Sequence, residues 1–116
     1  MDRERYILPR TGERPHTAAA TDSDLGTIDA QFDRRPYVVR IEVHGSVVTS
    51  LVLRNVTGNT DVLTLYPSDG KICRRFIGPN TGGVANWPGY GQQFGYSTTV
   101  SGAGNYSVSW EVAEVS

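Results

Sequence analysis

Alternation of apolar and polar residues with a period of two is the feature that most constrains the fold of this chain. Residues 105–112 show it most cleanly, because Tyr106, Val108, Trp110 and Val112 alternate with serines and Glu111. Successive side chains of a β-strand point to opposite faces, so the pattern predicts a strand with one buried and one solvated face. Comparable strand composition recurs in the segments 37–43, 47–54, 62–66, 72–77 and 94–100.

These short segments are separated by residues that form turns, and no segment shows the 3.6-residue period of a helix. A chain of 116 residues is long enough to bury one core without disulfides or metal. The predicted fold class is therefore all-β, an antiparallel β-sandwich or jelly-roll-like fold.

The segments 62–66 and 72–77 flank the turn-forming sequence Pro67-Ser68-Asp69-Gly70. Asp-Gly favours a tight turn, because glycine adopts a positive φ without a Cβ clash and aspartate tolerates it better than most residues. The sequence therefore predicts a β-hairpin here, which would fix the register of its neighbours.

Two pieces of the chain resemble the pre-peptidase C-terminal type of bacterial β-sandwich. The first piece runs Asp-Val-Leu-Thr-Leu-Tyr-Pro-Ser-Asp-Gly-Lys over residues 61–71, and the second runs Gly-Ala-Gly-Asn-Tyr-Ser-Val over residues 102–108. The resemblance implies a sandwich fold. Members of that family are secreted and attached to larger enzymes, whereas the charged start of this chain predicts no secretory signal.

Residues 1–35 differ in composition from the rest, since they hold 13 of the 23 acidic and basic residues and few apolar anchors. Such a stretch buries too little apolar area to offset the entropy of ordering it alone. We expect an extended N-terminal arm over residues 1–35 and a β-sandwich domain over residues 36–116. The arm either packs along its own sandwich or contacts another chain, and its expected contact residues are Tyr6, Ile7, Leu8, Arg10 and Arg14.

Net charge and hydropathy exclude several classes of protein. The formal net charge is -1 and the sequence pI is about 6.1, which disfavours nucleic acid as a partner. No window approaches the roughly 20 apolar residues that cross a membrane, so no membrane partner is expected. The lone Cys73 has no partner for a disulfide and is expected to be a buried, inert thiol.

The residues that most often carry catalysis or bind metal show no chemical pattern. Neither His16 nor His44 has a nucleophile or a carboxylate at a spacing that indicates catalysis. A calcium loop starting at Asp22 would place Gly26 where a ligand belongs and Thr27 where glycine is required. We therefore expect no catalytic residues, no metal and no cofactor, and a protein that is not an enzyme.

Residues 78–93 form a long connection rich in glycine and proline, which predicts neither helix nor central strand. Loops of this length are uncommon in compact domains unless they are functional or docked. Trp87, Tyr90 and Phe94 are its candidate partner-binding residues, because aromatic side chains are enriched at protein interfaces. Two alternatives are that Trp87 and Phe94 cap the end of the sandwich, or that the rings bind a saccharide.

A self-sufficient sandwich with an arm and an aromatic loop favours a non-enzymatic structural protein. We expect an accessory or decoration (cement) component of a viral (phage) capsid or similar assembly, located in the virion after assembly in the host cytoplasm. Its expected partners are the other protein chains of the lattice and further copies of itself, because exposed strand edges need covering. The alternative is a carbohydrate- or ligand-binding β-sandwich module.

Overall fold

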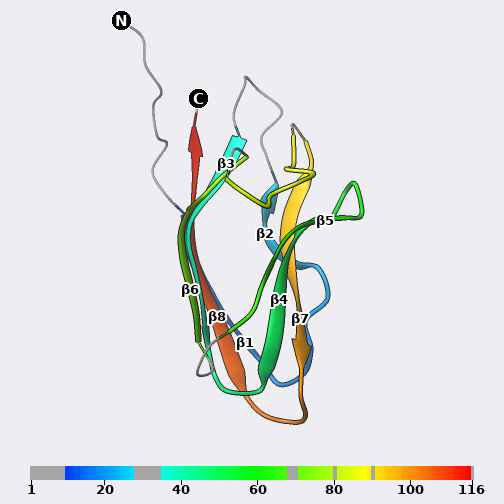
Figure 1. Cartoon of the computed structure of the whole chain (residues 1–116), viewed down its shortest axis with the longest axis vertical. Helices are drawn as coiled ribbons and strands as arrows, with labels where there is room; N and C mark the ends of the chain where they lie inside the picture. Colours follow the sequence, from blue (N-terminus) through cyan, green and yellow to red (C-terminus); the bar gives the residue numbers. More distant parts are fainter. Residues whose placement is uncertain (1–9, 28–34, 68–70, 80, 90, 116) are drawn as a thin grey trace, which may run out of the picture.

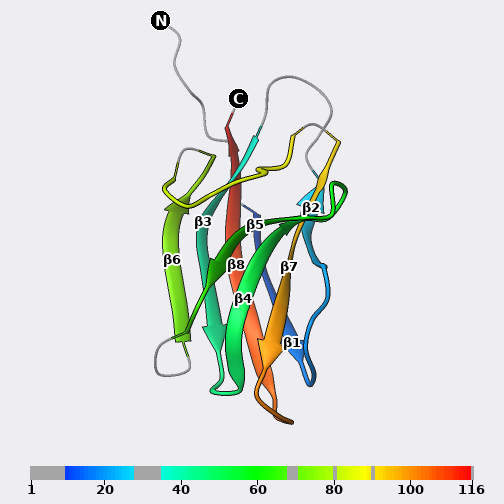
Figure 2. The same cartoon turned by 45° about the vertical axis from the view of Figure 1, so that its right-hand side comes forward.

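In the computed structural model, the described residues are 10–27, 35–67, 71–79, 81–89 and 91–115. These residues form eight strands in two antiparallel sheets that face each other (Figures 1 and 2). Sheet A contains, in spatial order, β1 (Arg10–His16), β8 (Tyr106–Val115), β3 (Arg35–His44) and β6 (Lys71–Ile77). Sheet B contains β2 (Ser23–Thr27), β7 (Gln93–Val100), β4 (Val48–Asn55) and β5 (Thr60–Leu65). The all-β sandwich predicted from the sequence is confirmed.

The strand order is that of a jelly roll. The pairs β1–β8, β3–β6, β2–β7 and β4–β5 nest like one long hairpin that has been folded over onto itself. Its innermost connection is the turn of residues 56–59 between β4 and β5, where Asn59 adopts a φ of 53°. Asparagine tolerates this left-handed backbone better than most residues.

The hairpin predicted around Asp69-Gly70 is not formed. β5 pairs with β4 in sheet B, and β6 pairs with β3 in sheet A, so the two predicted arms, joined by the connection of residues 66–70, belong to different sheets. Proline at position 67 lacks a backbone N–H and cannot extend a ladder directly after Tyr66. The connection is also longer than the two-residue loop that Asp-Gly turns favour.

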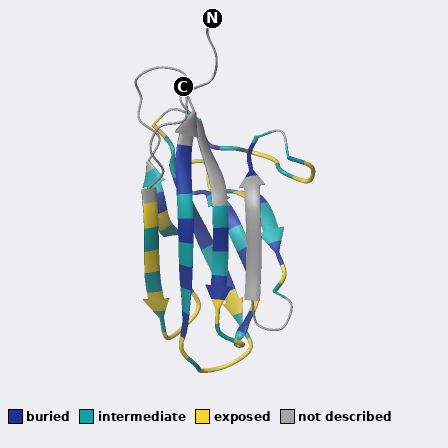
Figure 3. Ribbon diagram, turned by 90° about the vertical axis from the view of Figure 1, so that its left-hand side faces the viewer, coloured by how far each residue is buried: buried dark blue, intermediate teal, exposed yellow. Residues whose placement is uncertain are grey.

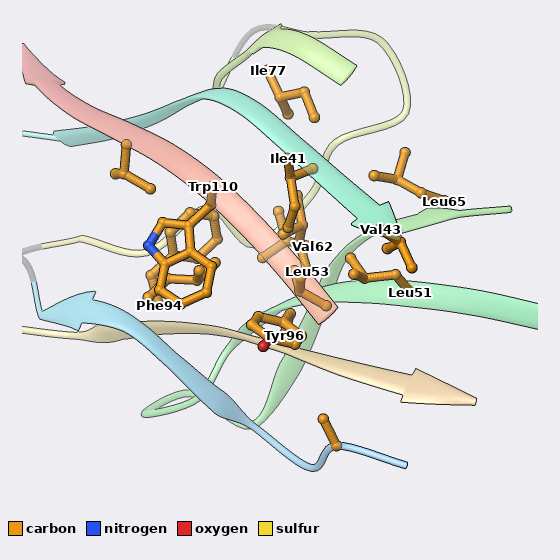
Figure 4. Close-up of a cluster of buried hydrophobic side chains, with 14 of the residues drawn as sticks. Ile41, Val43, Leu51, Leu53, Val62, Leu65, Ile77, Phe94, Tyr96 and Trp110 are labelled. Carbon is orange, nitrogen blue, oxygen red and sulfur yellow. The ribbon is translucent and has the colours of Figure 1, made fainter. Parts of the chain in front are cut away.

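The core lies between the sheets and contains the predicted set Tyr106, Val108, Trp110 and Val112 of β8 together with apolar side chains of the other strands. Ile41 and Val43 of β3 are completely buried and face Leu51 and Leu53 of β4 (Figure 4). Val108 of β8 is also completely buried. Burying one such side chain stabilises the fold by about 1.5–3 kcal/mol. The core also contains aromatic side chains, namely Phe94 and Tyr96 of β7 with Tyr106 and Trp110 of β8.

The described part of the predicted arm belongs to the sandwich. β1 is the edge strand of sheet A beside β8, and β2 is the edge strand of sheet B beside β7. The expected boundary between residues 35 and 36 therefore needs correction, because residues 10–27 contribute one strand to each sheet. Along β1, exposed residues alternate with half-buried ones (Figure 3). The half-buried positions are Gly12, Arg14 and His16, which an apolar pattern does not reveal.

Candidate functional site

Arg14 is the predicted contact residue that the structure describes best, and it acts within its own chain. Its guanidinium lies 5.5 Å from the centroid of the Trp110 ring. Its Nη1 donates a 2.6 Å hydrogen bond to Ser23 Oγ and a longer one, of 3.4 Å, to the carbonyl of Asp24. A cation over an aromatic face is attracted by the ring quadrupole. Arg14 thus fastens β1 to β2, and with them sheet A to sheet B.

His16 extends this polar network along the same flank. Its Nε2 lies 2.7 Å from Tyr96 Oη, and its ring stacks on Tyr106 with centroids 5.1 Å apart. Burial, followed by the nearby Arg14 charge, lowers the pKa of His16, and burial raises the pKa of the Tyr96 phenol. Both groups are therefore neutral near pH 7, and His16 holds β1 against the core.

Tyr106 and Thr98 fix the connection between β1 and β2. Tyr106 Oη donates to the carbonyl of Ala18 and lies 2.7 Å from Thr98 Oγ1. Thr98 Oγ1 accepts from the backbone N–H of Ala20, and the Thr98 backbone N–H donates to the carbonyl of Ala20. Backbone groups that leave a ladder need such partners when they are buried. The described residues 10–27 are consequently secured to their own sandwich.

The second histidine, His44, lies on the outer face of sheet A beside two residues that sequence reasoning did not connect with it. Its Nε2 lies 2.9 Å from Glu42 Oε1 and 3.4 Å from Ser109 Oγ. A Ser-His-acid triad needs the hydroxyl and the carboxylate on different ring nitrogens, because one accepts the proton while the other donates. Here both contacts fall on the same nitrogen, so the arrangement is not that of a triad. The signal in the sequence is the i, i+2 spacing of Glu42 and His44 on one strand.

Asn55 organises the end of the sandwich where β4, β6 and β8 end, called here the loop end. Its side chain is 5% exposed. Its Nδ2 donates to the carbonyl of Asn86 and to Gln92 Oε1, while its Oδ1 accepts from the backbone N–H of Gly58. One buried amide therefore joins the end of β4, the β4–β5 turn and loop 78–92.

Loop 78–92 is docked along the outer edge of β5. The Ala85 N–H donates to the carbonyl of Val62, and Asn86 Nδ2 donates to the carbonyl of Asp61, each at 3.1 Å. In Figure 2 this loop, drawn in yellow, runs across the loop end from β6 to β7. The long irregular connection is thus a docked element with a defined path, and part of the edge of β5 is covered by it.

The aromatic residues predicted to contact a partner have unequal positions. Phe94 is 1% exposed and packs in the core, so its assignment as a contact residue needs correction: a buried ring has no surface to offer. Trp87 is half-buried, packs against the core and lies 5.2 Å from Phe94 between ring centroids. This is the capping arrangement that the sequence left as an alternative. Tyr90 lies outside the described residues.

The other predicted contact residues stand at the start of the chain. Tyr6, Ile7 and Leu8 lie outside the described residues, and Arg10 opens β1 opposite Val112. The side chains of Arg10 and Cys73 are also outside the described part. Sequence reasoning missed Tyr66, which is 75% exposed and is the most prominent apolar side chain on the described surface.

A charged cluster lies at the loop end of sheet B. Arg54 of β4 donates to Asp22 Oδ1 at 3.0 Å, to Asp61 Oδ1 at 2.7 Å and to Asn59 Oδ1 at 2.6 Å. Hydrogen bonds to Asp22 and Asp61 raise the pKa of Arg54 further. The cluster ties the β1–β2 connection to β4 and β5. Asp22, the start of the calcium loop that the sequence pattern disfavoured, is thus bound to Arg54.

Within the described ranges, no group of three or more His, Cys, Asp and Glu side chains has the arrangement of a metal site. The described part of the chain likewise includes no helix of the length and apolarity needed to cross a bilayer. A scan against protein-family models, a search of curated proteins and a search of solved structures each found no match. The fold therefore defines the class, a small jelly-roll β-sandwich, and the resemblance to the pre-peptidase C-terminal type stays a prediction.

Proposed function

We propose that this chain is a non-enzymatic structural protein, an accessory or decoration component of a viral (phage) capsid or similar protein assembly. The observation that carries the proposal is the strand order β1-β8-β3-β6 and β2-β7-β4-β5. Double-sheet jelly rolls with this nesting recur in viral capsid and lectin domains. Because one fold hosts many functions, the function must also be argued from the surface of the molecule.

The support comes from where the predicted contact segments join the sandwich. The strand register places Ile77, Val38, Val112 and Arg10 in one row across sheet A. Loop 78–92 leaves β6 at one side of this row, and residues 1–9 precede β1 at the other. Both segments therefore connect to the same end of the molecule, the loop end, and two contacts on one rigid body bind with high effective concentration.

The anchoring part of the arm is shorter than the sequence suggested. Residues 10–27 are held by two ladders and by the Arg14 and His16 contacts, so they are not available to reach another subunit. The segment proposed to contact the assembly is residues 1–9, with the apolar run Tyr6-Ile7-Leu8. Loop 78–92 is proposed as the second contact, and its hydrogen bonds reduce the entropy that binding would otherwise cost.

The test uses assembled capsids that lack this chain and measures co-sedimentation. The full chain is expected to bind, and a chain without residues 1–9 is expected to lose affinity at least about tenfold, with an unchanged melting temperature. Gly102→Ala, in the turn at the opposite end, is the matched control and should bind like the wild type. Equal binding by the truncated chain, or no binding by the full chain, would contradict the proposal.

We also propose that copies of the chain associate through the edge of β6. The other edges are guarded, β1 by Pro15, β2 by a bulge between Asp24 and Gly26, and β5 by loop 78–92. β6 pairs with β3 through an unbroken register that contains neither bulge nor proline. Sedimentation velocity should show a fraction of dimer that rises with protein concentration. A monomer at every attainable concentration would contradict this proposal.

A further inference from the structure

The two outer faces of the sandwich differ in charge. The outer face of sheet A carries Arg40, Glu42, His44 and Glu111. In sheet B, β7 lies within residues 76–110 and most of β4 lies within residues 45–53. Neither of these stretches contains an acidic or basic residue. The described charged residues of sheet B are Arg54 and Asp61, which pair with each other, and Asp24 on edge strand β2.

Short hydroxyl side chains cover this neutral face in rows. Ser50 of β4 lies opposite Thr99 of β7, and Val52 lies between Ser97 of β7 and Thr64 of β5. Neighbouring strands are about 4.8 Å apart, so the rows form a regular lattice of polar groups. Ser50, Thr64 and Thr99 make no side-chain hydrogen bond within the described part of the chain. Each hydroxyl can therefore both donate to and accept from a ligand.

One aromatic ring borders this lattice. Tyr66 directly follows Leu65, the last residue of β5, and is exposed where the chain leaves sheet B. The pair Leu51–Leu65 shows that β5 ends next to the row of Ser50 and Thr99, away from the loop end. At 75% exposure the ring leaves apolar surface in water, which costs free energy unless a ligand covers it.

We propose that the outer face of sheet B, with Tyr66 at its margin, binds a neutral glycan. A sugar ring presents C–H groups on one face, which pack on an aromatic ring, and hydroxyls around its rim, which pair with serine and threonine. The charged side chains at the margin of this outer face are the carboxylates of Asp22, Asp24 and Asp61 with the single guanidinium of Arg54, which selects against phosphorylated, sulfated or uronic-acid ligands. A protein partner fits less well, since protein hot spots are usually deep clusters of Trp, Tyr and Arg, and this face supplies one ring.

This inference goes beyond the proposed structural function and does not depend on it. The segments proposed to contact the assembly join the sandwich at the loop end, whereas the row of Ser50 and Thr99 lies toward the opposite end of sheet B, as does the end of β5 before Tyr66. It also moves the saccharide alternative from loop 78–92, where Phe94 is buried, to a different surface. A lattice component that also carries a sugar-binding face would hold its particle close to a glycan-coated cell.

Affinity electrophoresis in gels containing starch, mannan, xylan, galactan or β-glucan tests the proposal. At least one of these neutral polysaccharides should retard the full chain, and Tyr66→Ala should weaken that affinity about tenfold. Thr99→Glu, which places a charge on the exposed face, should also weaken it. His44→Ala, on the outer face of sheet A, is the matched control and should migrate like the wild type. Thermal melting of each variant confirms that the fold is intact.

Competition with soluble oligosaccharides separates recognition of short sugar units from recognition of an extended polymer, and inhibition by either supports the proposal. Three results would overturn it: no retardation by any of the neutral polysaccharides, equal retardation of Tyr66→Ala and the wild type, or stronger retardation by alginate or heparin than by neutral gels. Because capsid binding is measured with the variant lacking residues 1–9, the two proposals fail independently.

Discussion

Gly12 of β1 packs directly against the Trp110 ring. A Cβ built at this position would lie 2.4 Å from Trp110 Cζ2, far inside van der Waals contact. Trp110 is 8% exposed and is covered by Arg14, so its ring has little freedom to withdraw. We expect Gly12→Ala to lower the free energy of unfolding by about 1–3 kcal/mol in urea denaturation. Gly102→Ala, where a Cβ meets nothing within 4 Å, is the control and should leave it unchanged.

His16 makes stability depend on pH. Burial and Arg14 lower its pKa in the folded state, so the unfolded chain, with a histidine pKa of about 6.5, takes up a proton more readily. The groups around it are Arg14 of β1, Tyr96 of β7 and Tyr106 of β8, and none is a carboxylate that would favour a charged imidazole. Its contribution is therefore full above about pH 6.5 and is lost as the pH falls through the folded-state value.

Urea midpoints measured between pH 7.5 and pH 5 should fall for the wild type and fall less for His16→Gln. His44→Gln provides the comparison, because His44 lies on the outer face of sheet A and its removal leaves the β1 network in place. A slope that persists unchanged in His16→Gln would show that other groups cause the pH dependence.

At the scale of elements, the docked state of loop 78–92 depends on a single buried amide. Asn55→Ala removes both donors to Asn86 and Gln92 and the acceptor for Gly58, and it leaves those groups without their partners. We expect a loss of about 2 kcal/mol in stability. Hydrogen exchange should also become faster at Ala85, whose N–H bonds to Val62. Asn105→Ala, at an exposed turn position, should do neither.

A strand could be predicted from the sequence where its own residues alternate between apolar and polar. The strands of residues 37–43, 47–54 and 105–112 were expected from alternation and are confirmed as β3, β4 and β8. β1 was missed because its half-buried residues are glycine, arginine and histidine, which pack through ring contacts and hydrogen bonds. β2 was missed because it spans five residues and places Leu25 in the core, which is too short a pattern to reveal a period of two. The β5–β6 hairpin was predicted from Asp-Gly, yet each arm pairs with a strand far away in the sequence.

At the scale of the whole molecule, residues 10–27 close one flank of the sandwich. A chain without residues 1–27 would expose the edges of β8 and β7 and uncover Trp110, Tyr96 and Tyr106. We expect this truncated chain to lose its cooperative thermal transition and to bind a dye specific for exposed apolar surface. Removal of residues 1–9 alone should preserve the transition, since it leaves both ladders intact. A cooperative transition in the chain lacking residues 1–27 would contradict the structural role assigned to β1 and β2.

The sequence by itself determined which side chains of β8 enter a core, because the period of two is a local property that any sheet must respect. It also indicated an all-β class and the absence of a chemical pattern around its histidines. Only the tertiary structure decided the jelly-roll order, the burial of Phe94, the exposure of Tyr66 and the docking of loop 78–92. These depend on pairing between strands far apart in the chain, such as β1 with β8, and local composition carries no information on which partner a strand finds.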